Sequence, residues 1–267
     1  MQIIELCRFS YPALGGFQVE HEGVEDRSAY LYRPERMEER FRHFETIMLP
    51  SFAAQTETDF TFVIVIGDNL PESYQERLFD LCAPIKQITI QAHAPADHRE
   101  TMQKSINAAR IKSDAPCLQF RHDDDDAIAL TFVEEFKRAA MDCRPLLERN
   151  KFVAFDFPRG YVVRPDAQGL HAEETYHPFW GVALGCSVAP HVRKSIMNFA
   201  HGRMGRFMPS ISFDKLVMYL RGHNDFNDSR QGPNVSQPKL KLLDADGEQM
   251  IRDTFNVDAD HIRAVFA

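Results

Sequence analysis

Hydrophobic residues in the first half of the chain alternate between short continuous runs and stretches with a helical period. Four strands are predicted from the runs, at 3–9, Phe60–Ile66, Ile85–Ile90 and Cys117–Arg121. Four helices are predicted from the periodic stretches, over Pro34–Pro50, from Pro71 to about Leu81, from Asp97 to about Lys112, and opening at Thr131. Regular alternation of strand and helix predicts an α/β fold with a mostly parallel central sheet and helices on both faces.

Local signals indicate where three of these helices begin or end. Asp97 is followed three residues later by Glu100, and Thr131 by Glu134, which is the spacing of a capping box. Pro50 is expected to end or kink the first helix, because proline lacks the backbone N–H that a helix interior needs.

The second half of the chain is less regular. Strands are predicted at 152–164 and 179–188, joined by a polar loop, and a last helix is predicted from Ser212 to Leu220, stopped by Gly222. The segment Asn224–Pro238, rich in Asn, Asp, Ser, Gly and Pro, is interpreted as a loop of the kind that closes over an active site.

Composition narrows the class of protein. The 267 residues include 31 Lys and Arg against 39 Asp and Glu, a net charge of −8, which argues against a nucleic-acid partner or a basic membrane-binding surface. Five widely spaced cysteines form no zinc or redox motif and suit buried thiols in a reducing cytoplasm. With no signal peptide and no apolar stretch of the roughly 20 residues that a membrane helix needs, a cytoplasmic protein without a transmembrane segment is expected.

The most informative motif is a run of four aspartates directly after the fourth predicted strand. In an open α/β sheet, ligands bind at the carboxyl ends of the strands, where Asp123–Asp126 lie. Adjacent carboxylates repel one another, and a divalent cation would compensate their charge. Mg²⁺ or Mn²⁺ is therefore the expected cofactor, bound through one or two carboxylates and the phosphates of a substrate. The simpler interpretation is a solvated acidic turn.

The stretch from Arg121 to Ile128, with its four aspartates, resembles the Asp-X-Asp-Asp signature of nucleotide-sugar glycosyltransferases of the GT-A fold. The opening Arg8-Phe9-Ser10 and the stretch from Arg33 to Ile128 resemble, more narrowly, a bacterial rhamnosyltransferase family. The resemblance implies one GT-A-like domain over 1–267, with a nucleotide-sugar-binding half at 1–126 and an acceptor-binding half at 127–267. It also implies a nucleoside-diphosphate-sugar donor and a saccharide or other hydroxyl acceptor.

The same resemblance suggests roles for individual residues. Asp123 and Asp125 would hold the metal and the diphosphate, Asp126 would orient the sugar, and His223 could complete the metal shell. Further contacts to the nucleotide-sugar are expected from residues on the first two strands and on the helix before the motif, namely Arg8, Ser10, Asp68, Arg99 and Asn107. For Asp68 a turn-forming role is equally compatible with the sequence, and for Arg99 and Asn107 a solvated helix face is the alternative.

An inverting transferase needs a general base to accept the proton of the attacking hydroxyl. Asp214 resembles the acid of a later motif that opens a helix, where the helix dipole would keep it ionised, although Phe213 stands where the family usually carries Glu. Trp180 could offer a sugar ring an aromatic face in the acceptor site, or could instead be a core residue.

Two other functions remain open from the sequence. A nucleotidyl or phosphoryl transferase would also use aspartates and a divalent metal, and a non-catalytic protein of the same fold could bind a glycan or nucleotide without turnover. No glycine-rich phosphate loop of either common type is present, which argues against dinucleotide-dependent dehydrogenases and P-loop enzymes.

Overall fold

The fold is built around a central sheet, seen here in a computed structural model that describes residues 1–15, 21, 23–226 and 237–267. Its seven strands are β1 (Ile3–Arg8), β2 (Thr61–Gly67), β3 (Ile88–His93), β4 (Cys117–Asp123), β6 (Phe152–Asp156), β9 (Leu184–Val188) and β10 (Ser210–Ser212), in the order β10-β6-β9-β4-β1-β2-β3. β1 to β4 run parallel, and β9 is antiparallel to both of its neighbours, β4 and β6. The carboxyl ends of β1, β2, β4 and β6 therefore meet at one edge of the sheet.

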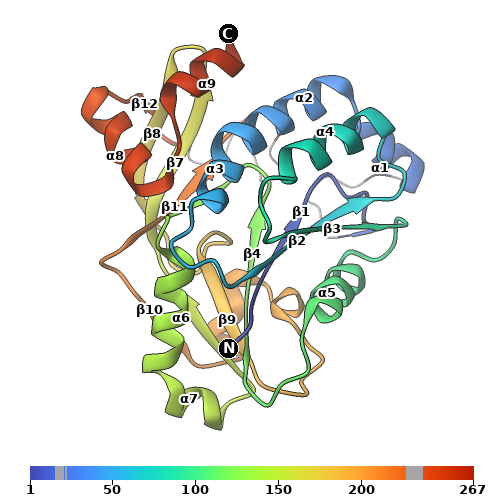
Figure 1. The fold of residues 1–267 in the computed structure, drawn as a ribbon, viewed down its shortest axis with the longest axis vertical. Helices are drawn as coiled ribbons and strands as arrows, with labels where there is room; N and C mark the ends of the chain where they lie inside the picture. Colours follow the sequence, from blue (N-terminus) through green and yellow to red (C-terminus); the bar gives the residue numbers. More distant parts are fainter. Residues whose placement is uncertain (16–20, 22, 227–236) are drawn as a thin grey trace.

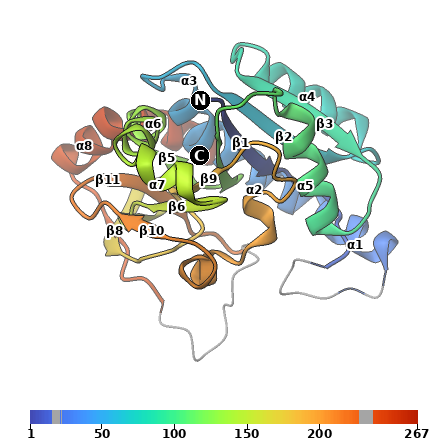
Figure 2. The same ribbon diagram turned by 90° about the horizontal axis from the view of Figure 1, so that it is seen from below.

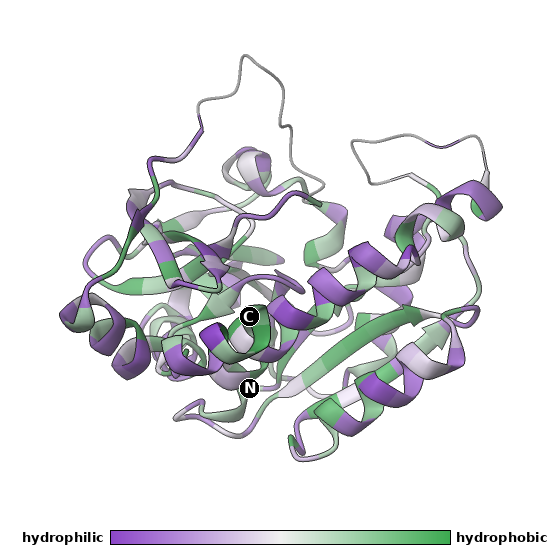
Figure 3. Cartoon of the chain, turned by 90° about the horizontal axis from the view of Figure 1, so that it is seen from above, coloured by the Kyte–Doolittle hydropathy of each residue, from purple (hydrophilic) through white to green (hydrophobic). Residues whose placement is uncertain are grey.

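Helices cover both faces of this sheet, as the sequence predicts (Figure 1). One face packs against α2 (Pro34–His43), η1 (Phe44–Met48), α3 (Leu49–Ala53), α4 (Glu72–Cys82) and α6 (Phe132–Asp142). The other packs against α5 (His98–Ala109), η2 (Ile196–Asn198) and η3 (His201–Arg206). β2 is apolar along its length because both of its faces are covered. In Figure 3 the central strands are green, while the helices carry both colours.

A second sheet is formed by strands from the second half of the chain. Its strands are β5 (Ala127–Ile128), β7 (Arg159–Asp166), β8 (Gly169–Tyr176), β11 (Val217–Gly222) and β12 (Lys241–Leu242), in the order β12-β8-β7-β11-β5. α7 (Arg144–Arg149) follows α6, and α1 (Val24–Leu31) precedes α2 (Figure 2). β5 follows the acidic run directly and pairs with β11, so the end of β11 lies beside the aspartates.

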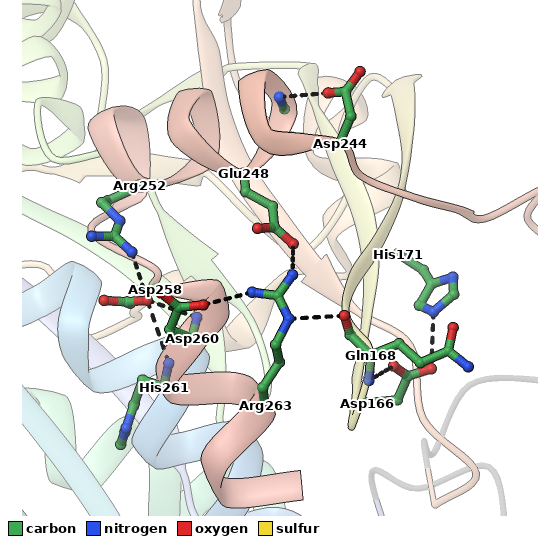
Figure 4. Close-up of polar contacts among 11 residues, drawn as sticks. Asp166, Gln168, His171, Asp244, Glu248, Arg252, Asp258, Asp260, His261 and Arg263 are labelled. Carbon is green, nitrogen blue, oxygen red and sulfur yellow. Dashed lines mark hydrogen bonds and ion pairs between the residues drawn. The ribbon is translucent and has the colours of Figure 1, made fainter. Parts of the chain in front are cut away.

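The C-terminal helices α8 (Ala245–Phe255) and α9 (Ala259–Phe266) are bonded to the hairpin of β7 and β8 (Figure 4). Arg263 on α9 forms an ion pair with Glu248 on α8 and donates from Nε to the carbonyl of Gln168 in the hairpin turn at 3.0 Å. Gly169 in this turn has φ +130°, and a side chain there would overlap Arg263 and Glu248. The hairpin and the two helices thus form one packed unit.

Two expectations about secondary structure are wrong, and a third is resolved in one of its two forms. The helix over Ser212–Leu220 is absent: β10 ends at Ser212, and Val217–Gly222 is β11, because this largely apolar segment is buried by pairing with β7 and β5. The polar loop between the two later strands is largely β8, whose charged residues face solvent. Pro50, which was expected to end or kink its helix, does not end it but lies in the first turn of α3, directly after a π-helical turn that interrupts the regular α-helix.

Other boundaries change less. The predicted strand at 152–164 is divided into β6 and β7, the strand at 179–188 is confined to β9, and the third strand begins three residues later than expected. Asp97 caps α5 as expected, accepting from the N–H of Glu100 at 2.9 Å. Thr131 makes no capping bond with its side chain; Glu134 instead accepts from the hydroxyl of Thr56 at 2.7 Å. The segment 227–236 of the expected loop lies outside the described residues.

Candidate active site

The acidic run lies at the edge where the parallel strands end. In the pairing of β1 with β4, Arg8 is directly opposite Asp123, and Asp68 follows the adjacent strand β2. The topology therefore gathers polar residues at the place where open α/β sheets bind ligands.

Only one of the four aspartates is exposed to solvent. Asp123 faces outward, whereas Asp124, Asp125 and Asp126 are buried, each with less than 5% of its surface exposed. Arg40 on α2 lies between the first two buried carboxylates, 2.8 Å from Asp124 Oδ1 and 3.1 Å from Asp125 Oδ2. These two carboxylates thus share one arginine of the protein itself.

The last aspartate is held by β11. Asp126 accepts from the N–H of Gly222 at 2.9 Å, and Arg221 lies 3.9 Å from its other oxygen. A side chain at position 222 would overlap the carbonyl oxygen of Asp125, so only glycine lets β11 approach this closely. Asn224, just beyond the strand, donates to Asp125 Oδ2 at 2.8 Å.

The surroundings raise the pKa of two aspartates and lower that of a third. Burial raises the pKa of Asp124 to about 6 despite the opposing charge of Arg40, and burial raises that of Asp126 well above its usual value despite Arg221. Partial loss of hydration among its neighbours also acts to raise the pKa of Asp123. The positive charges of Arg8, Arg221 and Arg121 outweigh this effect, so the pKa of Asp123 is lowered overall. Asp123 is therefore the aspartate whose charge is best stabilised, and it is the one that faces solvent.

Ser10 lies at this edge but is already bonded. Its hydroxyl accepts from Arg36 Nη1 at 2.9 Å, and the same guanidinium atom donates to the carbonyl of Leu31 at 3.1 Å. Ser10 has φ +47°, so the chain turns sharply as it leaves β1. Leu14, further along this loop, is bonded to both Ala96 and His98, which brings the start of α5 to the end of β1.

On α5, the residue beside the predicted one faces the site. Arg99 is exposed on the helix surface, whereas His98 lies among Arg8, Arg121 and Asp123. Burial, followed by the two arginines, lowers the pKa of His98 to about 3. Asn107 is in the last turn of α5, where its amide donates to the carbonyl of Arg193 at 2.8 Å, so it lies at the opposite end of the helix from His98.

Asp68 is exposed at the end of β2, where its backbone N–H donates to the carbonyl of His93 at 2.9 Å. Burial and then the charge of Asp68 raise the pKa of Tyr32, which places the two side chains near each other. The hydroxyl of Tyr32 donates to Asn69 at 2.9 Å.

Trp180 is part of an aromatic and cationic cluster. His177 stacks on its ring at 4.7 Å between centroids, and the guanidinium of Arg221 lies 4.7 Å from the ring centroid. The preceding residue, Phe179, has φ +55° and is held by Asp156, which accepts from its N–H at 3.0 Å and from the hydroxyl of Ser212 at 2.9 Å. The ring of Trp180 thus packs against the guanidinium of Arg221 and helps to fix its position.

Asp214 does not begin a helix. It is exposed in the turn between β10 and β11, so the helix dipole that was expected to keep it ionised is missing. Its role as the general base stays a prediction that depends on the motif resemblance alone.

The side chains around the acidic run are a poor match for the expected metal. Within the ranges that the structure describes, no three His, Cys, Asp or Glu side chains are grouped to hold an ion. Asp125 is bonded to Arg40 and Asn224, so a metal would have to displace them. His223 follows β11, bonded through its N–H to the carbonyl of Val163 at 2.8 Å, and burial lowers the pKa of its ring. These donors do not fit a metal site built by the protein alone, and metal dependence stays a prediction.

Most of the cations at this site carry little signal in the sequence. Arg40 and His98 belong to no motif, and Arg221 is informative only once β11 is known to be a strand that ends beside the aspartates. Arg121 lies within the acidic motif, but the motif resemblance assigns it no role.

Comparisons with known proteins give a family and several distant structures. The sequence model of a family described as "Putative rhamnosyl transferase" matches residues 2–235. Residues 1–349 of S. aureus TarS match at 11% identity over 83% of this chain and 60% of that one, with a TM-score of 0.41. A nucleotide-diphospho-sugar transferase, described as putative, from Desulfovibrio desulfuricans G20 matches at 10% identity over 84% of this chain and 82% of that one, with a TM-score of 0.34. The search of curated proteins found no match. None of the described helices has the length and apolar character needed to cross a membrane.

Proposed function

The chain belongs to the family described as "Putative rhamnosyl transferase", and we propose that it transfers a sugar from a nucleoside-diphosphate-sugar to a hydroxyl of a saccharide or similar acceptor. Rhamnose is the sugar that the family description names. The observation that carries the proposal is the cluster at the carboxyl edge of the sheet, where the exposed Asp123 is surrounded by Arg8, Arg121 and Arg221. Anionic donors suit a cluster of arginines, and a carboxylate within it can accept from sugar hydroxyls.

In the proposed reaction the acceptor oxygen attacks the anomeric carbon, and the bond between that carbon and the diphosphate oxygen breaks. The nucleoside diphosphate leaves with the bonding electrons, and the acceptor proton passes to a base, for which Asp214 is the predicted residue. Cations near the diphosphate stabilise the charge that develops on it. Attack from the face opposite the leaving group would invert the anomeric centre.

A divalent ion would add Lewis-acid stabilisation of the same leaving group. Its exposed protein ligand would be Asp123, with the remaining ligands from the diphosphate and water. Because Arg40 and Asn224 are bonded to the carboxylate of Asp125, no step of the proposed reaction depends on the ion.

The test is turnover with UDP-, dTDP- and GDP-sugars and a panel of saccharide acceptors, analysed for the released product. A glycosyltransferase releases the nucleoside diphosphate, whereas release of pyrophosphate would indicate a nucleotidyltransferase. Asp123→Asn is expected to lower kcat/KM by roughly 100-fold, within the range for removing a group that positions reacting atoms. Asp114→Asn, a fully exposed carboxylate just before β4 at the opposite edge of the sheet, is the matched control. Absence of turnover and of nucleotide binding with every donor would refute the proposal.

A further inference from the structure

Three arginines from three strands surround Asp123, the exposed aspartate of the acidic run. Leu6 packs in the apolar cluster beneath α5, so Arg8, two residues further along β1, points to the same face of the sheet. In the pairing with β4, Leu6 is opposite Arg121 and Arg8 is opposite Asp123. Adjacent strands are about 4.8 Å apart, so Arg8, Arg121 and Asp123 form a compact group on the face covered by α5.

The third arginine reaches this group from the second sheet. Arg221 lies in β11, 3.9 Å from Asp126 Oδ2, and only 17% of its side chain is exposed. The ring of Trp180 packs against its guanidinium, and Gly222 allows the strand end to approach the acidic run. Two separate contacts thus fix the position of Arg221.

The balance of charge in this region is positive. Asp124 and Asp125 share Arg40, and Arg36 lies close enough to lower the pKa of Asp124. Five arginines therefore accompany the four aspartates of the acidic run. A cluster of this kind favours an anion, and its positive charge opposes the approach of a divalent cation.

We propose that Arg8, Arg121 and Arg221 form the binding site for the diphosphate of the donor and that this site binds the nucleotide without a divalent ion. The proposal rests on the proposed function for the identity of the ligand. Guanidinium groups match phosphate oxygens with paired hydrogen bonds, which gives them both affinity and orientation. In this arrangement Asp123 competes with the diphosphate for the arginines and contacts the sugar rather than a metal.

The experiment is calorimetric titration of UDP, dTDP and GDP into the full chain, once in EDTA and once with MnCl₂. The wild type is expected to bind one of these nucleotides in EDTA. Arg8→Gln and Arg221→Gln should each weaken that binding roughly 10- to 100-fold, the equivalent of one charge-assisted hydrogen bond or more. Arg221→Lys should recover part of the loss. Arg144→Gln, an exposed arginine on α7, should leave affinity unchanged.

Asp123→Asn separates the two kinds of site. If arginines hold the diphosphate, this variant binds the nucleotide in EDTA as tightly as the wild type or more tightly, because a competing negative charge is gone. If a metal held by Asp123 bridges the diphosphate, the variant loses affinity. Circular dichroism and thermal unfolding of each variant establish that it is folded before it is titrated.

The outcomes distinguish the proposal from the function on which it rests. Nucleotide binding that requires MnCl₂, or binding in EDTA that the Arg8 and Arg221 variants leave unchanged, overturns the arginine site and leaves the glycosyltransferase proposal intact. Failure of every nucleotide to bind, with and without metal, refutes the proposed function itself.

Discussion

Single residues in this protein are ionised or neutral according to their immediate neighbours rather than their type. Asp123 lies among arginines and keeps its charge, while Asp126, three residues along, is buried and has its pKa raised. Glu5 is the extreme case. It lies in the middle of β1 between Phe62 and Phe120 in the paired strands, is fully buried, and neither of its carboxylate oxygens has a hydrogen-bond partner.

Glu5 leads to a prediction about pH and stability. Burial raises its pKa in the folded state well above the usual value, so its contribution to stability is fully present below the unfolded pKa and is lost as pH rises through the folded pKa. Glu5→Met, which removes the buried carboxyl at similar volume, is expected to increase the free energy of unfolding at pH 7.5 by about 1–3 kcal/mol. The gain should be smaller at pH 5. Urea unfolding at both pH values measures it.

Glu5→Gln is the control, because it keeps a polar group but removes the titration. Its stability should depend less on pH than that of the wild type. If the free energy of unfolding depended on pH in the same way in the wild type and in Glu5→Met, Glu5 would not be neutral in the folded protein.

At the scale of elements, the site depends on a strand from the second sheet reaching the end of a strand in the first. β11 pairs with β5, which comes directly after the acidic run. The last residues of β11 are Arg221 and Gly222, whose N–H donates to Asp126, and the chain then leads to Asn224, which donates to Asp125. On the other side, α2 continues through the π-helical turn of η1 into α3, and it supplies Arg40. The aspartates are therefore positioned by two elements distant in sequence.

Gly222→Ala tests this contact. The added methyl group would overlap the backbone of Asp125, which the paired strand cannot easily avoid, so we expect a loss of about 1–3 kcal/mol in the free energy of unfolding. Nucleotide affinity should fall as Arg221 is displaced. Gly202→Ala is the matched control, because nothing lies within 4 Å of its added carbon. Equal nucleotide affinity and stability in the two variants would contradict the close approach.

At the scale of the whole molecule, the chain forms two sheets whose connections differ. The central sheet is covered on both faces. The β7–β8 hairpin packs against α8 and α9 through apolar residues such as Leu170 and Ile262, and the polar contacts of Arg263 add to this packing (Figure 4). Because the contacts of Arg263 lie close to solvent, they hold less strongly than the apolar core, and their loss is expected to loosen the C-terminal unit before the central sheet.

Hydrogen exchange measures this difference. Arg263→Ala removes the ion pairs to Glu248 and Asp260 and the bond to Gln168, so amide exchange should accelerate in α9 and in the β7–β8 turn. Exchange in β1, β2 and β4 should stay unchanged. Arg144→Ala, which removes a surface pair confined to α7, is expected to leave the hairpin unaffected. Uniform acceleration across both sheets would instead indicate one cooperative unit.

The parts of the fold that depend on local pattern can be predicted from the residues alone. The apolar runs of β1, β2 and β4, the helices between them and the cap at Asp97 follow from periodicity and side-chain chemistry over a few residues, and the family follows from motifs in the same region. The position of the aspartates at a strand end was predicted for the same reason.

The tertiary structure alone decided how these aspartates are neutralised. Arg40 lies 84 residues before Asp124, and Asn224 lies 99 residues after Asp125. β11 was mistaken for a helix because its strand character comes from pairing with β7 and β5 and not from its own short sequence. A local pattern can indicate that charge needs a partner, but the identity of that partner depends on contacts between distant segments, which form only when the chain folds.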